Sequence, residues 1–202
     1  MDAHVEDRLQ GPALHRLDNL NAPMPHAAAV PEDSFLATYS RGHAYTDCYI
    51  TSANGVVSLC VLIEAFYTTP LFKLERWVLA TLFKIRSTDV QARQIALAQS
   101  TQFAAWKVER RSAHEILLDA GQTRLWLCVA PASAEGAATS VLFGSAVVPM
   151  RPDGKFGPAF HALLGFHRLY SKLLLSAAVR RIPAIARSQN VAAQTHDRPN
   201  FR

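Results

Sequence analysis

The sequence predicts an α+β fold in which an antiparallel sheet packs against a long C-terminal helix. Hydrophobic residues alternate with a period of two over four successive segments after Thr101, which is typical of strands. Short turn-forming stretches separate these segments, so we expect neighbouring hairpins. Beyond them, residues 160–182 repeat hydrophobic side chains with helical spacing as far as Pro183, where we expect the helix to end.

The chain divides by composition into three parts. Residues 1–33 contain four prolines and no sustained period, which indicates an irregular N-terminal arm. Residues 34–183 are predicted to form a single α+β domain, and residues 184–202 a disordered tail. With 202 residues, half of them hydrophobic, the chain is long enough to bury one core.

The first half of the predicted domain contains one strand and three helices. β-forming residues at 44–51 end at a Ser-Ala-Asn-Gly turn. The hydroxyl of Ser58 can cap a helix that begins near Leu59. Pro70 interrupts that helix because it has no amide hydrogen, and a second helix is expected to follow it. Residues 87–89 then supply the N-cap of a third helix.

The second half of the domain is predicted to be mainly sheet. Four strands are expected at residues 103–111, 115–119, 123–130 and 139–149, which makes about five in all. Residues 120–122 are interpreted as a three-residue hairpin loop. This loop would place Asp119 opposite Thr123, and it would place Ile116 opposite Trp126.

The predicted strand 123–130 is apolar on both faces. Leu125 and Leu127 lie on one face, whereas Trp126 and Cys128 lie on the other. An antiparallel sheet with one face in water would alternate apolar and polar residues, so a second layer must cover this strand. A helix, the N-terminal arm or a partner chain could provide it, and the last helix is the preferred cover for one of the two faces.

Composition excludes several kinds of partner. The net charge of +5 is mild, and no run of Lys and Arg interleaved with aromatic residues occurs, so we expect no nucleic-acid partner. Charged residues interrupt the apolar stretch 56–83, so no transmembrane segment is expected. No nucleotide fingerprint and no metal-type spacing of His or Cys is present, so no cofactor or metal is expected.

The expected compartment is the cytoplasm. The first residues lack the continuous apolar stretch of a secretory signal. Cys48, Cys60 and Cys128 are odd in number, far apart and set among apolar residues, which is typical of buried thiols in a reducing environment.

Glu64 and Tyr67 belong to the densest cluster of polar residues within an apolar stretch. A buried carboxylate with a raised pKa beside a phenol could transfer protons at the rim of a pocket, with Glu75 as a second carboxylate. Alternatively, Glu75 is a helix-surface charge, and Glu64 pairs with an arginine across the core.

Trp106, Trp126 and Arg124 form a second set of candidates. Aromatic residues at alternating strand positions could line an apolar cavity with Arg124 at its mouth, or the tryptophans are simply core residues. Asp47 is either polar lining or a strand-edge residue without a task. Tyr170 lies on the apolar stripe of the last helix and completes the candidate lining.

Five segments resemble an uncharacterised bacterial domain-of-unknown-function family. They are residues 45–49, 66–76, 103–106, 143–149 and 163–170. The order of elements is also similar to the helix-grip class of START-like (SRPBCC) proteins, which includes lipid-transfer, pollen-allergen and aromatic-cyclase proteins. This resemblance implies a curved sheet that wraps the last helix and leaves a cavity for lipophilic ligands. The class includes both binders and enzymes, so it implies no catalytic residue.

Three functional hypotheses follow. The first is a binding protein for a hydrophobic small molecule, with its pocket between the sheet and the last helix. The second is a proton-transfer enzyme of the cyclase or hydrolase kind. The third is a homodimer, structural or interacting in role, in which the second apolar sheet face joins two copies.

Overall fold

The computed structural model describes residues 23–84, 86–131, 138–149 and 158–196. Three sequence-based predictions lie wholly or partly outside these residues. They concern residues 1–22 of the N-terminal arm, residues 132–137 of the turn-forming stretch between the last two predicted strands, and residues 197–202 of the tail.

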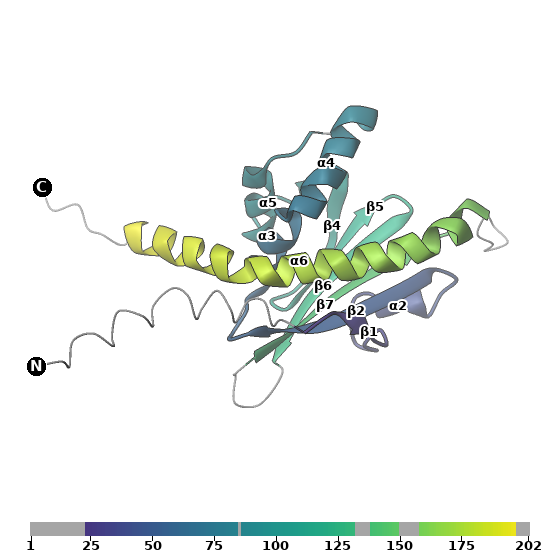
Figure 1. The fold of residues 1–202 in the computed structure, drawn as a ribbon, viewed down its shortest axis with the longest axis horizontal. Helices are drawn as coiled ribbons and strands as arrows, with labels where there is room; N and C mark the ends of the chain where they lie inside the picture. Colours follow the sequence, from purple (N-terminus) through teal and green to yellow (C-terminus); the bar gives the residue numbers. More distant parts are fainter. Residues whose placement is uncertain (1–22, 85, 132–137, 150–157, 197–202) are drawn as a thin grey trace, which may run out of the picture.

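One open antiparallel sheet forms the centre of the described structure (Figure 1). Its strands are β1 His26–Ala27, β2 Tyr45–Asn54, β3 Gln102–Phe103, β4 Trp106–Arg111, β5 Glu115–Ala120, β6 Thr123–Pro131 and β7 Ala138–Val147. Their order across the seven-stranded sheet is β1-β2-β7-β6-β5-β4-β3. The sequence correctly predicted the meander from β4 to β7, because each of these strands pairs with the next along the chain.

Five helices accompany the sheet in the described residues. They are α2 Ala37–Ser40, α3 Leu59–Tyr67, α4 Pro70–Phe83, α5 Asp89–Ala96 and α6 Pro158–His196. The long α6 crosses one face of the sheet, α3 packs beside it, and α4 projects away from the sheet (Figure 1). The predicted fold is therefore confirmed: an α+β chain with an antiparallel sheet packed against a long C-terminal helix, in a helix-grip-like arrangement.

The predicted helix starts are confirmed as well. Ser58 Oγ accepts a hydrogen bond from Val61 N at the start of α3. Pro70 is the first residue of α4, where its missing amide hydrogen costs nothing. Thr88 and Gln91 exchange side-chain and backbone hydrogen bonds in a capping box at the start of α5.

The sheet contains more strands than the five that the sequence indicated. The segment 103–111 is two strands, β3 and β4, because Ala104 adopts a left-handed backbone conformation (φ 53°) that turns the chain. Part of the predicted arm also joins the sheet, since His26 and Ala27 pair with β2. Strands of two residues are too short to show a hydrophobic period, so the pattern could not reveal them.

The β5–β6 hairpin differs by one residue from the predicted register. Its loop has two residues, so Ala120 pairs with Thr123 and Asp119 pairs with Arg124. Gly121 has a positive φ of 72°, and its N–H donates to Asp119 Oδ1 at 2.7 Å. The prediction that Ile116 lies opposite Trp126 is therefore wrong.

The last helix does not end at Pro183, as the sequence suggested, but continues to His196. Residues 184–196, expected in a disordered tail, are helical. Pro183 removes one backbone hydrogen bond, whereas Ile182 and Ile185 on either side of it are buried in the core. The burial of apolar side chains beyond the proline outweighs the lost bond.

The sheet has an apolar core on each face. Between the sheet and α3, α5 and α6 lies the larger core, which includes Phe66, Phe143 and Leu175. On the other face, Trp126 and Leu142 pack against Leu36. The N-terminal segment 23–44 therefore covers the second apolar face of the sheet. Of the three covers considered for this face, a helix, the N-terminal arm or a partner chain, the arm is the one observed.

Glu115 and Gly144 hold this covering segment in place. Glu115 Oε2 accepts hydrogen bonds from Phe35 N at 2.9 Å and from Trp126 Nε1 at 2.6 Å. A Cβ atom at Gly144 would lie 2.4 Å from Leu36 Cδ2 and 2.9 Å from the carbonyl oxygen of Asp47. Glycine is thus required at 144 because Leu36 packs directly on the backbone of β7.

Candidate functional site

A cavity of about 230 Å³ lies between the sheet and the helices α4 and α6. Strands β6 and β7 form its floor, β4 contributes Trp106, and the helices form its roof. Most of its wall is apolar, with Phe72, Leu125, Phe143 and Leu174 among the lining residues. The predicted position, between the sheet and the last helix, is where this cavity lies.

One stripe of α6 supplies much of the roof. His167, Tyr170, Ser171 and Leu174 follow the spacing i, i+3, i+4 and i+7, so they share one face of the helix. Three of these four side chains are polar, although they face the core side of the helix. Polar groups placed in this way need partners inside the protein or in the cavity.

Three buried polar atoms among the described residues have no hydrogen-bond partner, and all three belong to this region. Trp106 Nε1 and Ser171 Oγ belong to side chains that line the cavity. The third atom is the hydroxyl of Tyr67, whose ring is fully buried and packs on the cavity residue Phe72 with 4.8 Å between centroids. A buried donor without an acceptor costs about 1–3 kcal/mol, so three such groups around one cavity are unusual.

Glu75 and Tyr170 join the two helices at the cavity wall. The Tyr170 hydroxyl donates to Glu75 Oε2 at 2.5 Å. Burial raises the pKa of Glu75 above its ordinary value, although the hydrogen bond from Tyr170 and the nearby His167 partly offset this effect. Burial and the charge of Glu75 raise the pKa of Tyr170 in turn. The carboxyl group of Glu75 therefore holds a proton more strongly than an exposed glutamate does.

Asp47, Ser145 and His167 form a second polar group at the same wall. Asp47 lies directly opposite Ser145 in the β2–β7 pair, and Ser145 Oγ donates to Asp47 Oδ1 at 2.6 Å. His167 Nε2 lies 3.0 Å from Ser145 Oγ and 3.2 Å from Asp47 Oδ2. Burial alone would raise the pKa of Asp47, but hydrogen bonds from His167 and Ser145 outweigh it and lower the pKa.

This arrangement does not activate Ser145 as a nucleophile. In a Ser-His-Asp relay the histidine uses one ring nitrogen toward the serine and the other toward the aspartate. Here the same nitrogen of His167 faces both residues, and the Ser145 hydroxyl already donates to Asp47. The group fixes His167 and Ser145 at the cavity wall instead.

The predicted site residues are spread over three places. Trp106 and Tyr170 line the cavity, and Asp47 and Tyr67 lie one side chain behind its wall. Glu64 is remote from the lining, because Gln189 Nε2 donates to Glu64 Oε2 at 2.7 Å near the other half of α6. One interpretation of the sequence paired Glu64 with an arginine, but in the structure its partner is the Gln189 amide.

The side chains of Trp126 and Arg124 make their contacts on the opposite face of the sheet. Trp126 is buried in the core beneath the N-terminal segment. Arg124 borders the cavity at the end of β6, but its guanidinium donates to the Tyr39 hydroxyl and to Asp119 Oδ1 at 2.7 Å each. It also forms an ion pair with Glu109 at 2.8 Å. The charge of Arg124 is therefore engaged away from the cavity.

Comparison with protein-family models, curated proteins and solved structures finds no match to this chain. Both family resemblances thus stay predictions from sequence. Over the described ranges, no helix has both the length and the apolar run that crossing a bilayer requires.

Sequence reasoning did not select three groups at the cavity. Ser145, His167 and Ser171 line it without having been chosen as candidates. The spacing of His167 with Tyr170 and Ser171 on one helical stripe was a signal that could have found two of them. Ser145 could be found only with the β2–β7 register, which joins it to Asp47 across 98 positions of the chain.

Proposed function

We propose that this protein binds a compact, mostly apolar molecule that carries at least one hydrogen-bond-accepting oxygen. The cavity between the sheet and α6 is the binding site. The observation that supports this proposal most strongly is the gathering of unpartnered polar atoms from Trp106, Ser171 and Tyr67 around one apolar cavity. A carbonyl or hydroxyl oxygen of a ligand would accept from Trp106 or Ser171, which line the cavity, while its carbon skeleton would contact the apolar wall.

The size of the cavity limits the ligand. Its volume of about 230 Å³ lies below the roughly 300–1,000 Å³ of sites that hold drug-sized molecules. One or two fused rings, or a short branched chain, fit this volume better than a long acyl chain does. The predicted resemblance to lipophilic-ligand binders agrees with the apolar character of the wall.

Calorimetric titration with naphthol, and with naphthalene as its oxygen-free counterpart, tests the proposal. We expect naphthol to bind more tightly, because only naphthol offers an oxygen to Trp106 and Ser171. In Ser171→Ala the preference should shrink about two- to twelvefold, since one net hydrogen bond contributes roughly 0.5–1.5 kcal/mol. If neither compound binds, the proposal is contradicted.

Ser176→Ala is the matched control. Ser176 is also buried on α6, but it does not line the cavity. Its replacement should leave naphthol affinity unchanged. Ser171→Ala should also be at least as stable as the parent protein, because it removes a buried hydroxyl without a partner.

A second candidate function is proton transfer to or from a bound molecule. The observation that favours it is Glu75, a cavity-lining carboxyl with a raised pKa that contacts Tyr170. As an enzyme of the cyclase or hydrolase kind, the protein would use Glu75 as general acid or base. Glu75→Gln should then retain ligand binding and abolish conversion of the bound ligand, measured by mass spectrometry of the incubated compound.

The homodimer hypothesis loses its original motivation. It assumed that the second apolar face of the sheet needs a partner chain. The segment 23–44 of the same chain covers that face, with Leu36 buried against Trp126.

A further inference from the structure

The helices α4 and α6 expose large apolar side chains on one surface. On α6 these are Phe166, Leu169 and Leu173, with 67%, 58% and 46% of their surface exposed, and their spacing places them on one stripe. On α4 they are Leu74 and Trp77, exposed by 57% and 65%. We call these five residues the α4–α6 apolar surface.

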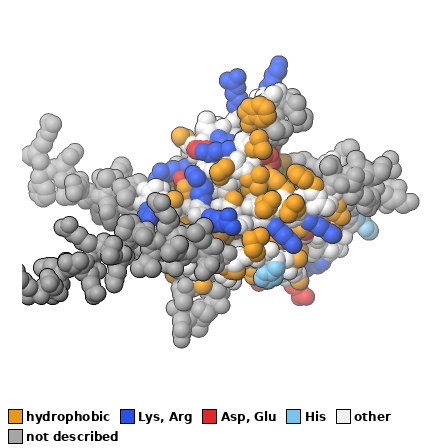
Figure 2. All heavy atoms as spheres, in the orientation of Figure 1, with side chains coloured by type: hydrophobic (Ala, Val, Ile, Leu, Met, Phe, Trp, Pro, Cys, Tyr) orange, Lys and Arg blue, Asp and Glu red, His pale blue; other side chains and the backbone are white. Residues whose placement is uncertain are grey.

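The two stripes belong to one surface because the helices are joined beside them. The hydrogen bond from Tyr170 to Glu75 links α6 to α4, and each partner is the sequence neighbour of an apolar-surface residue, Leu169 or Leu74. Figure 2 shows hydrophobic side chains gathered over α6 and the adjoining part of α4 on the face toward the viewer. Lys and Arg side chains lie to the left of them and below them in this view, and few Asp and Glu side chains are seen there.

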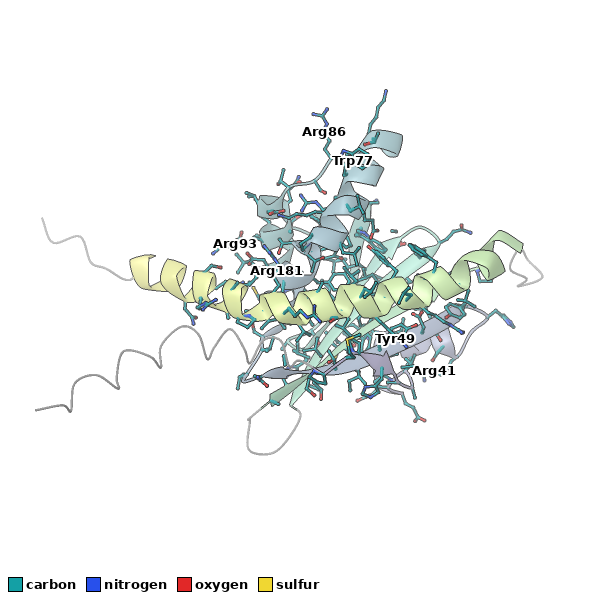
Figure 3. The ribbon with its side chains drawn as sticks, in the orientation of Figure 1. Arg41, Tyr49, Trp77, Arg86, Arg93 and Arg181 are labelled. Atoms are coloured by element: carbon teal, nitrogen blue, oxygen red, sulfur yellow. The ribbon has the colours of Figure 1, made fainter. Side chains whose placement is uncertain are left out.

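The charges around this surface are mainly positive, and Asp89, which lies in the hollow beside Trp77, is paired with Lys73 and Arg76. The sequence of α6 contains no Asp or Glu over its 39 residues, and it exposes Arg168, Arg180 and Arg187. On α4 the single acidic residue is Glu75, which is engaged with Tyr170. Arg86 and Trp77 line one surface hollow, and Figure 3 shows both near the outer end of α4.

We propose that the α4–α6 apolar surface docks on an anionic phospholipid bilayer. Trp77, Phe166 and the leucines would enter the boundary between head groups and acyl chains, while Arg168, Arg180 and Arg187 would meet lipid phosphates. Tryptophan prefers this boundary because its ring is apolar and its N–H can face water. The proposal does not rest on a ligand in the cavity.

Charge complementarity favours a lipid surface over a second copy of the chain. In a two-fold dimer the same patch faces itself, so the arginines of one copy would approach those of the other. An anionic bilayer offers negative charge to all the arginines around the α4–α6 apolar surface. Docking also requires no crossing of the bilayer, for which none of the described helices is suited.

Co-sedimentation with vesicles tests the proposal. The full-length protein should sediment with phosphatidylcholine vesicles that contain phosphatidylserine, and not with phosphatidylcholine alone. The bound fraction should fall as salt rises, because screening weakens the attraction. Binding should also shift the tryptophan emission to the blue through Trp77, since Trp126 is fully buried and Trp106 is half-buried.

Two variants and two matched controls separate docking from general charge effects. Trp77→Ser should lower vesicle affinity at least tenfold, and Arg180→Glu should lower it about fivefold or more. Val56→Ser and Arg41→Glu remove an exposed apolar residue and an exposed charge outside the α4–α6 apolar surface, so both should bind like the parent. All four residues are exposed, so circular dichroism should show unchanged folding.

Three results would overturn the proposal. The first is absence of sedimentation with anionic vesicles at low salt. The second is binding that Trp77→Ser and Arg180→Glu leave unchanged. The third is a dimer in light scattering that Trp77→Ser dissociates, because the occupant of the surface would then be a second copy.

Discussion

Tyr170 on α6 donates a 2.5 Å hydrogen bond to Glu75 on α4, and this contact lies at the wall of the cavity. It holds together two helices that are otherwise in limited contact, since α4 projects away from the sheet (Figure 1). Tyr67 lies close enough for the charge of Glu75 to raise the pKa of its hydroxyl, after the larger effect of burial. The carboxyl group of Glu75 therefore affects both tyrosine hydroxyls near this wall.

Replacing Glu75 by Gln should change how stability depends on pH. Burial raises the folded-state pKa of Glu75, so the folded protein holds this proton more strongly than the unfolded chain does. Its contribution to stability is fully present below the unfolded pKa and is lost as pH rises through the folded pKa. Relative to Glu75→Gln, the parent should lose stability in urea titrations as pH rises above the ordinary glutamate pKa of about 4.3. If the free energy of unfolding depends on pH in the same way for the two proteins, this account is contradicted.

Asp47→Asn should have the opposite pH dependence. The folded-state pKa of Asp47 is lowered, so its contribution to stability is present above the unfolded pKa and is lost as pH falls through the folded pKa. At neutral pH the variant should be less stable by about 1.5–3 kcal/mol, because hydrogen bonds to a charged group are lost. The deficit should shrink below about pH 4. The exposed residue Asp33 provides the control, since Asp33→Asn should change stability at neutral pH by no more than about 0.5 kcal/mol.

Gly144→Ala should loosen the N-terminal cover of the sheet. The added Cβ would meet Leu36 and the backbone of Asp47, and overpacking of this kind costs about 1–3 kcal/mol. Leu36→Ala should relieve only part of the cost in the double variant, because the Asp47 carbonyl remains 2.9 Å away. Chemical unfolding would measure these differences. Gly42→Ala is the control, since its Cβ would lie at an ordinary 3.7 Å from the nearest atom.

Arg124→Gln tests whether the charge of Arg124 stabilises the covered face of the sheet or takes part in ligand binding. Its guanidinium binds Tyr39 and Asp119 on the covered face, so the variant should lower stability and leave naphthol affinity unchanged. Unfolding and calorimetric titration on the same sample would show both effects. Loss of affinity without loss of stability would place the charge of Arg124 in the cavity, contrary to our assignment.

The fold class was predictable because its signals are local. The period of two after Thr101 marked the meander, and Ser58 marked a helix start with its capping hydroxyl. Features that depend on tertiary contacts were missed. From the sequence alone, Pro183 predicts a helix end, because the burial of Ile182 and Ile185 becomes known only with the structure.

The candidate site was predictable only in part. Trp106 and Tyr170, both predicted to line a pocket, lie at the cavity, since an aromatic strand residue and a helix stripe both point toward the layer between sheet and helix. Trp126 was selected by the same reasoning, but strand alternation alone cannot say which face holds the cavity. Glu64 resembled Glu75 in its apolar setting, but Glu64 binds Gln189 away from the cavity, whereas Glu75 lines the cavity.

The indole N–H signals in a heteronuclear NMR spectrum test the central claim most directly. The chain has three tryptophans: Trp106 lines the cavity and its Nε1 is unpartnered, Trp126 Nε1 donates to Glu115, and Trp77 is exposed. On titration with naphthol, the Trp106 signal should move downfield and saturate, while the other two stay in place. A Trp106→Phe variant would identify the signal by its absence. If the Trp106 signal does not move, or if all three move together, the cavity is not the binding site that we propose.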